Sequence, residues 1–255
     1  MHLVRFEKDQ QIQFGYLDGE RIGPLMGDPY GEFSRGTLRW PVEEVRLLPP
    51  CQPSKIIGLT SNFADRVREQ GRRAPTMPVV FLKPPSSIIG PEQAIELPPQ
   101  AQEVEYGAEL AVVIGRIARH ISPEAAAHYI LGYTCANDVT ARDLIEQDEL
   151  WTRGKSFDTF CPLGPAIATH LDPTEVMITG LVNGETRQMA STHDMLFTVP
   201  QVLAFVTSVM TLLPGDVILM GTPGGARPLA AGDMVEVTIE GIGTLRNPVQ
   251  VATEN

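Results

Sequence analysis

One apolar run constrains the fold of this chain more than any other feature of its sequence. Residues 111–114 read Ala-Val-Val-Ile and end at Gly115, a β-branched pattern that is typical of a buried strand. Alternation along that strand points Glu105, Gly107 and Glu109 toward the same face. A carboxylate that enters a buried strand is costly unless a cation meets it. Glu109 therefore needs either a metal ion or a basic side chain as its partner.

A second carboxylate is the best candidate to share that partner. Asp138 ends a strand that is predicted over residues 130–138, while the strand of Glu109 is predicted over residues 104–114. A hard divalent cation such as Mg²⁺ or Mn²⁺ takes one or two carboxylates, and water and substrate oxygens complete its shell. Two carboxylates alone do not make a metal motif. The alternative is that both are unrelated strand-end residues, each paired with an arginine.

Composition bounds the kind of protein and its partners. The chain has 255 residues, with 20 Lys and Arg against 31 Asp and Glu, a formal charge of −11, so nucleic acid is not an expected partner. No apolar run approaches the roughly 18 residues that cross a bilayer, and the first residues lack the apolar core of a signal peptide. We therefore expect no membrane partner and a cytoplasmic location.

Strand and turn signals divide the chain into two parts. Residues 1–48 are predicted to form a small all-β domain, with a hairpin turn at Asp18-Gly19. Prolines at 49 and 50 mark the boundary, and the main domain is predicted over residues 51–254. A polar helical segment at 62–71 suits a mobile lid. The other predicted elements are strands at 55–59 and 78–83, helices at 122–129, 141–148 and about 199–210, and a loop-rich stretch at 151–165.

Several residues outside the two carboxylates are candidates for binding a ligand. Arg142 and Lys155 could bind a substrate carboxylate or an enolate, although such side chains are more usually solvated. The backbone amides of a glycine-rich turn at 221–225 could approach a ligand, or the turn could be an ordinary one. His193 is the only histidine near a plausible site loop, where a lone histidine is more often a surface residue.

Taken together, these segments resemble the fumarylacetoacetate hydrolase family. The resemblance runs in order over roughly residues 50–250, and its most specific block comprises NDVTARD at 137–143 and KSFDTFCPLGP at 155–165. The remaining matching segments are 55–59, 81–84, 109–115, 182–184, 213–216 and 221–223.

The resemblance implies a fold, a chemistry and an assembly. The fold is a mixed β-sandwich roll of the α+β class with a small N-terminal β domain, usually in a homodimer. Family members act on small β-keto or 2,4-dioxo acids by C–C hydrolysis, decarboxylation or keto–enol isomerisation. They hold Mg²⁺ or Mn²⁺ with a Glu-x-Glu pair and an aspartate, while a His–Glu pair on a lid activates water. No organic cofactor is implied.

The family's functional residues carry over to only part of this chain. The second metal-binding glutamate falls on Glu109 and the aspartate on Asp138. The lid glutamate falls on Glu69, and the lysine that contacts substrate falls on Lys155. The predicted substrate-binding residues are Arg142, Ile145, Phe63 and Thr222.

Three positions depart from the family pattern, and all three belong to the active site. Gly107 replaces the first glutamate of the metal-binding pair, Arg66 replaces the lid histidine, and Ile145 replaces a glutamine. Ile145 would make the pocket more apolar. Loss of one carboxylate predicts that any metal is held weakly. We therefore hypothesise that the guanidinium of Arg66 stands between Glu109 and Asp138, where the metal would lie.

These departures predict an altered reaction. Without the lid histidine the hydrolases' water-activating base is missing, so an isomerase, decarboxylase or lyase-type enzyme is favoured over a C–C hydrolase. Arg66, Arg142 and Lys155 would stabilise the developing negative charge, and Glu69 would shuttle the proton if burial raised its pKa. The alternatives are a metal-dependent hydrolase of the acylpyruvate type and a non-catalytic ligand-binding homologue.

Overall fold

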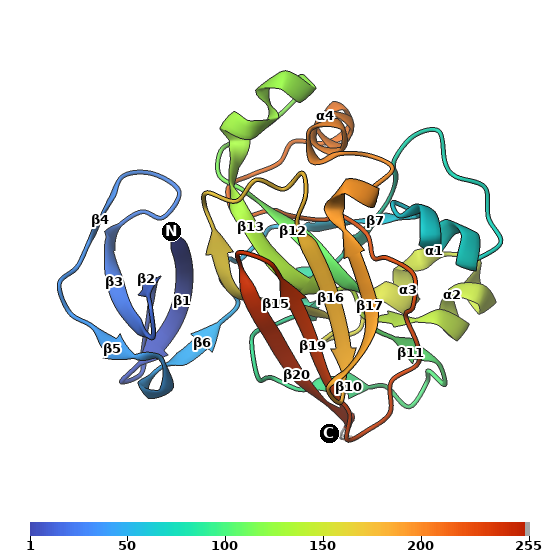
Figure 1. Ribbon diagram of the computed structural model, residues 1–255, viewed down its shortest axis with the longest axis horizontal. Helices are drawn as coiled ribbons and strands as arrows, with labels where there is room; N and C mark the ends of the chain where they lie inside the picture. The colour runs from blue at the N-terminus through green and yellow to red at the C-terminus, as the bar shows by residue number, and fades with distance from the viewer. Residues whose placement is uncertain (253–255) are drawn as a thin grey trace.

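The computed structural model describes residues 1–252, and most of its regular structure is strand (Figure 1). Ten strands of a 13-stranded sheet follow the path β4-β3-β2-β1-β15-β13-β12-β18-β7-β8, while β5, β6 and β9 pair with β3, β1 and β15, respectively. A five-stranded sheet follows β10-β20-β19-β16-β17. The prediction of a mixed β fold with few helices is confirmed. Among the described residues, no helix has the length and apolar character needed to cross a membrane.

The first 48 residues form the strands at one end of the large sheet, shown in blue in Figure 1. The hairpin predicted at Asp18-Gly19 is present, and Gly19 has a φ of +61°. β1 also pairs with β15 of the main body, so the sheet runs on without a break between the two parts. The strands are β1 (His2–Lys8), β2 (Gln11–Asp18), β3 (Arg21–Gly27), β4 (Phe33–Arg35), β5 (Trp40–Pro41) and β6 (Arg46–Leu48).

The remaining strands build the main body. Its predicted range ended at residue 254, but residues 253 and 254 lie outside the described part of the chain. The strands are β7 (Ile56–Thr60), β8 (Val79–Lys83), β9 (Ile88–Ile89), β10 (Ile95–Leu97), β11 (Val104–Glu105), β12 (Ala108–Ile114), β13 (Ile130–Asn137), β14 (Thr140–Ala141), β15 (Cys161–Ala168), β16 (Met177–Val182), β17 (Glu185–Ser191), β18 (Val217–Leu219), β19 (Met234–Ile239) and β20 (Gly243–Val251).

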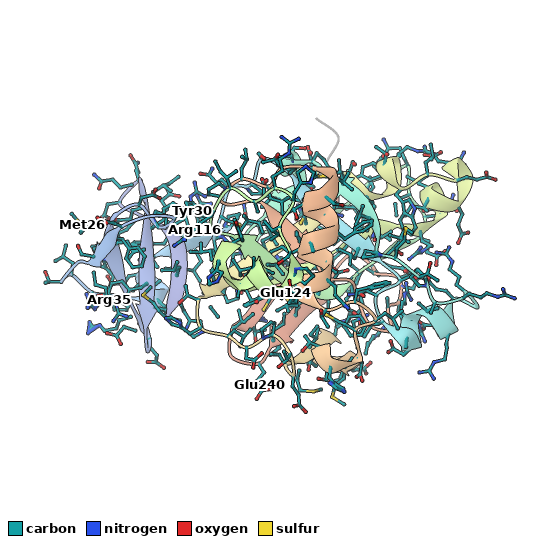
Figure 2. The ribbon with its side chains drawn as sticks, turned by 90° about the horizontal axis from the view of Figure 1, so that it is seen from above. Met26, Tyr30, Arg35, Arg116, Glu124 and Glu240 are labelled. Carbon is teal, nitrogen blue, oxygen red and sulfur yellow. The ribbon has the colours of Figure 1, made fainter. Side chains whose placement is uncertain are left out.

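Short helices lie around the sheets. Two sequence-based predictions are corrected. The stretch 151–165 was expected to be loop-rich but contains a helix and the start of a strand, and the helix predicted at 122–129 is a 3₁₀ helix over 123–129. Seen from above, Figure 2 shows the N-terminal strands at one end and α1 and α2 at the other. The helices are α1 (Ala64–Glu69), α2 (Arg142–Asp148), α3 (Trp151–Lys155) and α4 (Val199–Val209), with 3₁₀ helices η1 (Val42–Glu44), η2 (Pro85–Ser87), η3 (Pro123–Tyr129) and η4 (Thr192–Asp194).

β12, which contains the apolar run at residues 111–114, lies in the interior of the large sheet. Every residue of β12 is buried, and β12 pairs with β13 on one side and β18 on the other. The continuous strand predicted over 104–114 is wrong, because the chain leaves the sheet at Tyr106 and Gly107. The Gly107 amide donates to Asn137 Oδ1 at 2.9 Å, and β11 pairs with β14 in a separate two-stranded sheet. Glu105 and Glu109 therefore lie on separate strands, and the alternation of side chains along one strand does not place them on the same face.

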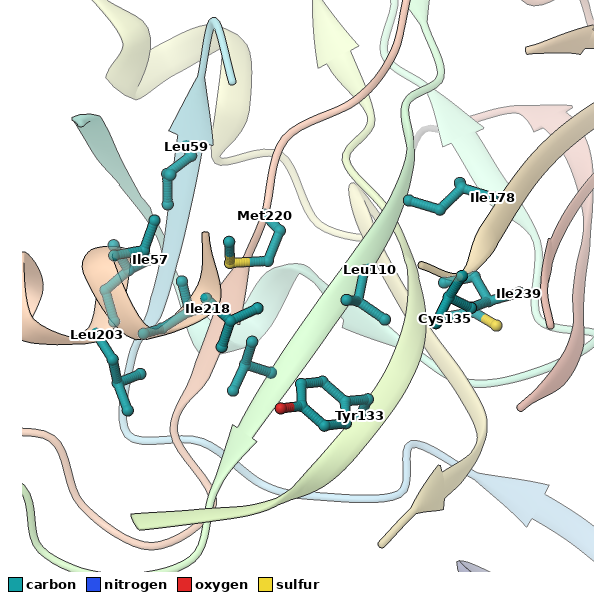
Figure 3. Close-up of a cluster of buried hydrophobic side chains, with 14 of the residues drawn as sticks. Ile57, Leu59, Leu110, Tyr133, Cys135, Ile178, Leu203, Ile218, Met220 and Ile239 are labelled. Carbon is teal, nitrogen blue, oxygen red and sulfur yellow. The ribbon is translucent and has the colours of Figure 1, made fainter. Parts of the chain in front are cut away.

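The main hydrophobic core lies between the two sheets and under α4. Figure 3 shows Leu110 of β12, Ile178 of β16 and Leu203 of α4 among the side chains that meet there. Burial of a leucine or isoleucine side chain typically stabilises a fold by ~1.5–3 kcal/mol. This core holds the ends of β12, β13 and β18 in place, and the polar side chains of the candidate site project from those ends.

Candidate active site

Acidic and basic side chains from separate parts of the chain meet in a narrow inner cavity of about 30 Å³. Glu109 comes from β12, Asp138 follows β13 directly, and Lys155 is the last residue of α3. The cavity is lined by Leu59, Thr60, Ser61, Arg66, Gln70, Phe81, Glu105, Tyr106, Gly107, Glu109, Asp138, Thr140, Arg142, Trp151, Lys155 and Thr222. The sequence-based expectation that Glu109 and Asp138 share one pocket is thus met by the geometry.

Two lysines neutralise Asp138. Lys83 Nζ lies 2.8 Å from Asp138 Oδ1, and Lys155 Nζ forms an ion pair with Asp138 Oδ2. Burial alone would raise the pKa of Asp138, but the charges of Lys155 and Lys83 outweigh it and lower that pKa. Asp138 is therefore charged at neutral pH, and both of its oxygens are occupied by ammonium groups.

Lys155 is held in place with one donor to spare. An ammonium group has three N–H donors; one points to Asp138 and another to Thr140 Oγ1, 2.7 Å away. The Phe81 ring centroid lies 4.4 Å from Nζ, and Phe81 stacks on Trp151. Burial lowers the pKa of Lys155 to about 8, against the opposing effect of Asp138. The group thus remains largely protonated at pH 7.

Among the described residues, Glu109 forms no ion pair with a basic side chain. Its Oε2 accepts a hydrogen bond from the Gly221 amide at 2.7 Å, and the left-handed backbone of Gly221, with a φ of +88°, brings that amide inward. Burial, followed by the charge of Asp138, raises the pKa of Glu109 well above its ordinary value. The neutral, protonated form of this carboxyl group is therefore more favoured than in a free glutamate.

Arg66 does not stand between Glu109 and Asp138, so the hypothesis that it takes the metal's place is not met by this geometry. Its guanidinium lies 2.9 Å from Glu69 and 2.9 Å from Glu105. Glu105 Oε2 also accepts from Arg142 Nη2 at 3.2 Å. The physical reason is that Lys83 and Lys155 already neutralise Asp138, while the carboxylates of Glu69 and Glu105 both lie within ion-pair distance of the Arg66 guanidinium.

A second, outer cavity of about 330 Å³ adjoins the inner one, and four residues line both. We call these four residues the neck. The neck consists of Arg66, Gln70, Glu105 and Arg142. Gln70 Oε1 is buried without a hydrogen-bond partner among the described residues. The neck therefore lies between the outer cavity and the inner cavity that contains Lys155.

Glu69 lies in the outer cavity and does not reach the inner one. It accepts from Arg66, from Arg227 at 2.9 Å and from the Gly225 amide at 3.2 Å. Burial would raise the pKa of Glu69, but these hydrogen bonds outweigh it and lower that pKa. The condition set for Glu69 as a proton shuttle, a pKa raised by burial, is thus not met, because its partners stabilise the charged form.

The remaining predicted residues divide between the cavity and the core. Thr222 lines the inner cavity. Ile145 does not, because it packs against α3 so closely that a Cβ at Gly154 would lie 2.5 Å from Ile145 Cγ1. Phe63 is fully buried in the main core, and His193 is exposed on η4. The cavity wall is therefore largely polar, against the prediction of a more apolar pocket.

Sequence reasoning assigned no role to Lys83, Thr140 or Gln70. A lysine at the end of a strand usually reaches solvent, so nothing marked Lys83 as the fully buried partner of Asp138. Glu105 did carry a signal, since it was placed beside Gly107 and Glu109 from the outset. The break after β11 then directs it toward two arginines.

The donor set does not fit the divalent metal that the family implies. Gly107 supplies no side-chain ligand, Asp138 is bound through both oxygens to lysines, and Glu105 is bound to two arginines. Across residues 1–252, no three His, Cys, Asp or Glu side chains lie together as a metal-binding group. Mg²⁺ requires a near-ideal octahedral oxygen shell, which these residues do not offer.

Comparison with known proteins identifies the class to which this fold and site belong. A family model described as fumarylacetoacetate (FAA) hydrolase C-terminal matches residues 55–250, and one described as Rv2993c-like, N-terminal matches residues 1–50. The chain therefore belongs to the fumarylacetoacetate hydrolase family.

Three relatives illustrate the range of that family. A structure of 5-carboxymethyl-2-hydroxymuconate delta-isomerase from Mycobacterium smegmatis is 44% identical with a TM-score of 0.92 and covers 99% of this chain and 100% of its own. Human mitochondrial oxaloacetate tautomerase FAHD2A is 42% identical over 222 residues, 82% of this chain and 71% of the relative. Maleylpyruvate hydrolase from a Sphingobium species, in complex with manganese(II) and pyruvate, is 28% identical with a TM-score of 0.83, covering 99% and 100%. The prediction of an enzyme of this family is confirmed.

Proposed function

We propose that this enzyme isomerises a small 2-oxo acid between its keto and enol forms. The observation that carries the proposal is that Lys155, which uses only two of its three donors within the described residues, lines the same inner cavity as Glu109. An enolate needs a positive group at its oxygen and a proton carrier at its carbon, and no activated water. Two of the relatives are named for an isomerisation, which supports this assignment.

Each charged residue then has a defined task. The Lys155 ammonium donates to the substrate oxygen on which negative charge develops, and Asp138 and Thr140 hold it in that orientation. Glu109 carries a proton to or from the neighbouring carbon. In ketonisation Glu109 gives its proton to the carbon, the enol O–H bond breaks, and that proton passes to the Glu109 carboxylate, so the protein returns to its starting state. The fold would supply this chemistry without an organic cofactor.

Hydrolysis receives less support from the same geometry. No histidine lines the inner or the outer cavity, and the lid carboxylate Glu69 is tied to two arginines. Decarboxylation would use the same positive group as isomerisation and remains the closest related reaction. A homodimer and a cytoplasmic location stay predictions from the sequence.

The test is the ketonisation of enolic oxaloacetate, followed by ultraviolet absorbance. Lys155→Met should lower the rate by about 10²-fold or more, the usual cost of losing one charge-stabilising donor. Arg153→Gln is the matched control, because Arg153 lies on the same helix but pairs with Asp148 at the surface. A full rate in Lys155→Met, or C–C hydrolysis of an acylpyruvate by the wild type at roughly 1–10³ per second, would contradict the proposal.

A further inference from the structure

One glutamine of the five-stranded sheet joins two segments of the active site. Gln188 lies on β17, and its side chain is fully buried. Its Oε1 accepts a hydrogen bond from the Ala108 amide at 3.0 Å. Its Nε2 donates to Thr222 Oγ1 at 2.8 Å and to the Pro223 carbonyl at 2.7 Å. Gln188 therefore holds the glycine-rich turn at 221–225 against the start of β12.

These three hydrogen bonds fix the orientation of the Gln188 amide group. An amide oxygen only accepts hydrogen bonds, and an amide nitrogen only donates them. If the group were flipped, a donor would face the Ala108 N–H and an acceptor would face the Pro223 carbonyl. Both hydrogens of Nε2 are therefore committed, one to Pro223 and one to Thr222.

The orientation of Gln188 determines how Thr222 can bond to a ligand. Because Nε2 can only donate, Thr222 Oγ1 is the acceptor of that hydrogen bond, and the hydroxyl keeps one hydrogen of its own. Thr222 Oγ1 makes no other hydrogen bond within the described residues. Thr222 lines the inner cavity with Lys155, so its O–H group is available as a donor to a ligand there.

Close packing also holds the turn on β17. Gly225 has a φ of +98°, and a Cβ there would lie 2.1 Å from the carbonyl oxygen of Arg187, so only glycine allows this approach. The same turn provides the Gly221 amide that binds Glu109 Oε2 at 2.7 Å. A turn that moved away from β17 would therefore displace both that amide and Thr222.

We propose that Gln188 is a positioning residue of the active site, which holds the turn at 221–225 and presents the Thr222 hydroxyl as a hydrogen-bond donor to a substrate oxygen. The inference rests on the proposed function for its ligand class, because a 2-oxo acid supplies the acceptor oxygen. Gln188 lines neither the inner nor the outer cavity. It acts on the ligand only through the turn.

A double-mutant cycle on pyruvate binding tests whether Gln188 acts through Thr222. Pyruvate is a stable 2-oxo acid, so isothermal titration calorimetry measures its Kd without turnover. Gln188→Met and Thr222→Val should each weaken pyruvate about tenfold, as expected for the loss of one hydrogen bond. The double variant should bind within about twofold of Thr222→Val, because the two effects are coupled. Thr222→Ser, which keeps the hydroxyl, should keep the affinity of the wild type.

Asn247→Leu is the matched control, because it also removes a buried side-chain amide. Asn247 is 1% exposed, lines neither cavity, and donates through Nδ2 to the Gly90 and Gln93 carbonyls at 2.9 and 2.8 Å. Asn247→Leu should lower the melting temperature, as Gln188→Met does, and leave the Kd for pyruvate within about twofold. Gln188→Asn, whose amide is one methylene too short to keep all three hydrogen bonds, replaces Gln188→Met if that variant does not fold.

Three results would overturn the role of Gln188. The first is equal weakening of pyruvate by Gln188→Met and Asn247→Leu, which would indicate a general loss of stability. The second is an additive loss in the double variant, which would show that Gln188 does not act through Thr222. The third is an unchanged Kd in Thr222→Val.

The same proteins separate this inference from the proposed function. If the two substitutions are additive but the wild type accelerates the ketonisation of enolic oxaloacetate, the role of Gln188 is wrong and the proposed function stands. If the substitutions are coupled in pyruvate binding but the wild type does not accelerate ketonisation, the proposed function fails and the role of Gln188 stands. A wild type that binds no pyruvate would contradict the inference, because Thr222 would then have no 2-oxo acid to bind.

Discussion

Two acidic side chains at the inner end of the cavity are neutralised in different ways. Asp138 keeps its charge, because Lys83 and Lys155 each bind one of its oxygens. Glu109 instead has a raised pKa, because it is buried and lies near the charge of Asp138. Two buried like charges are costly, so the charge of Asp138 favours the protonated form of Glu109. This difference supplies an anchor for Lys155 and a proton carrier beside it.

The state of Lys155 leads to a prediction about pH. Burial lowers its pKa to about 8, while Asp138 and Glu109 oppose that effect and Lys83 adds to it. The ammonium form is the one assigned to the enolate, so the isomerisation rate should fall as pH rises through about 8. A pH profile of kcat/KM measures this. Lys155→Arg, which stays charged, should remove the fall even if its rate is lower.

A contrary result is easily recognised. If the wild-type rate stays level up to about pH 10, near the ordinary pKa of a lysine, then the loss of the Lys155 proton does not control the reaction.

Substitution can restore the family residues at positions 107 and 66, where Gly107 replaces a metal-binding glutamate and Arg66 replaces the lid histidine. A Cβ at Gly107 would lie 3.2 Å from the Asp138 carbonyl oxygen and 3.3 Å from Thr222 Cβ, so a glutamate there requires only a small shift. Gly107→Glu combined with Arg66→His should bind Mn²⁺ and melt at a higher temperature in its presence. Ligand at about 100 times its Kd stabilises by ~2.7 kcal/mol. Metal analysis after dialysis, with Arg66→His alone as control, measures the gain; stoichiometric Mn²⁺ in the wild type would contradict it.

At this scale the sequence predicted which residues meet, but not how they pair. Glu109, Asp138, Arg142, Lys155 and Thr222 all line one cavity, as expected. The expected contact of Arg66 with Glu109 failed, because pairing depends on which opposite charge is nearest in space. A resemblance to a family cannot predict which charged residues pair at positions where this chain departs from the family pattern. A single lysine at the end of a strand, such as Lys83, also gives no indication in the sequence that it is buried.

At the scale of elements, α1 is attached to the body at both ends. Phe63, before its first turn, and Val67 are buried, and the Gly224 amide donates to Asp65 Oδ2 at 3.0 Å. At the other end Glu69 binds Arg66, Arg227 and the Gly225 amide. The helix is only six residues long, well below the length at which isolated helices are stable. Its structure therefore depends on these contacts.

Glu69→Gln should loosen α1 without unfolding the protein. The substitution removes the charge that Arg66 and Arg227 share, and each hydrogen bond to a charged group typically contributes ~1.5–3 kcal/mol. Amide hydrogen exchange over residues 64–72 should become at least about tenfold faster, while β12 and β13 keep their protection. Arg68→Gln is the control, because Arg68 is exposed on the same helix. Equal protection in Glu69→Gln and wild type would show that Glu69 does not hold the helix.

Element prediction succeeded where one local pattern decides the structure. Strands β7 and β8 and helix α4 follow the expected ranges, because their apolar runs, proline positions and capping residues all agree. The break in the strand at Tyr106 and Gly107 was missed, since it arises from Asn137 on another strand. The Lys155 segment was expected to be a loop, yet α3 forms where Gly154 allows close packing on α2.

At the scale of the whole molecule, the N-terminal strands and the main body are joined by strand pairing and by a common hydrophobic cluster. β1 pairs with β15, and Leu3, Tyr16 and Leu25 pack in one cluster with Val113 and other body residues. In Figure 2, Tyr30 and Arg116 lie where the two parts meet. Shared strands and a shared core indicate that the two parts unfold as one cooperative unit, although the sequence separated them at prolines 49 and 50.

Single-tryptophan variants test that cooperativity. Trp40 reports on the N-terminal part and Trp151 on the cavity, so Trp151→Phe and Trp40→Phe proteins should give coincident denaturant curves. Leu3→Ala should destabilise both by ~2–5 kcal/mol, the usual cost of truncating a buried leucine. Ile12→Ala, at a position that is 55% exposed on β2, should change neither curve by more than about 0.5 kcal/mol. Separate midpoints for the two tryptophans would show independent domains.

The edge of the large sheet has a consequence for solubility. β8 ends that sheet and pairs only with β7, so its outer edge is free to pair with another chain. The strand is short and lies between Pro78 and Pro84, and it turns Lys83 inward to Asp138. Short length, flanking prolines and inward-pointing charges are the features that keep sheet edges from joining. The lysine that neutralises Asp138 is thus also one of the features that distinguish this edge from an aggregation-prone one.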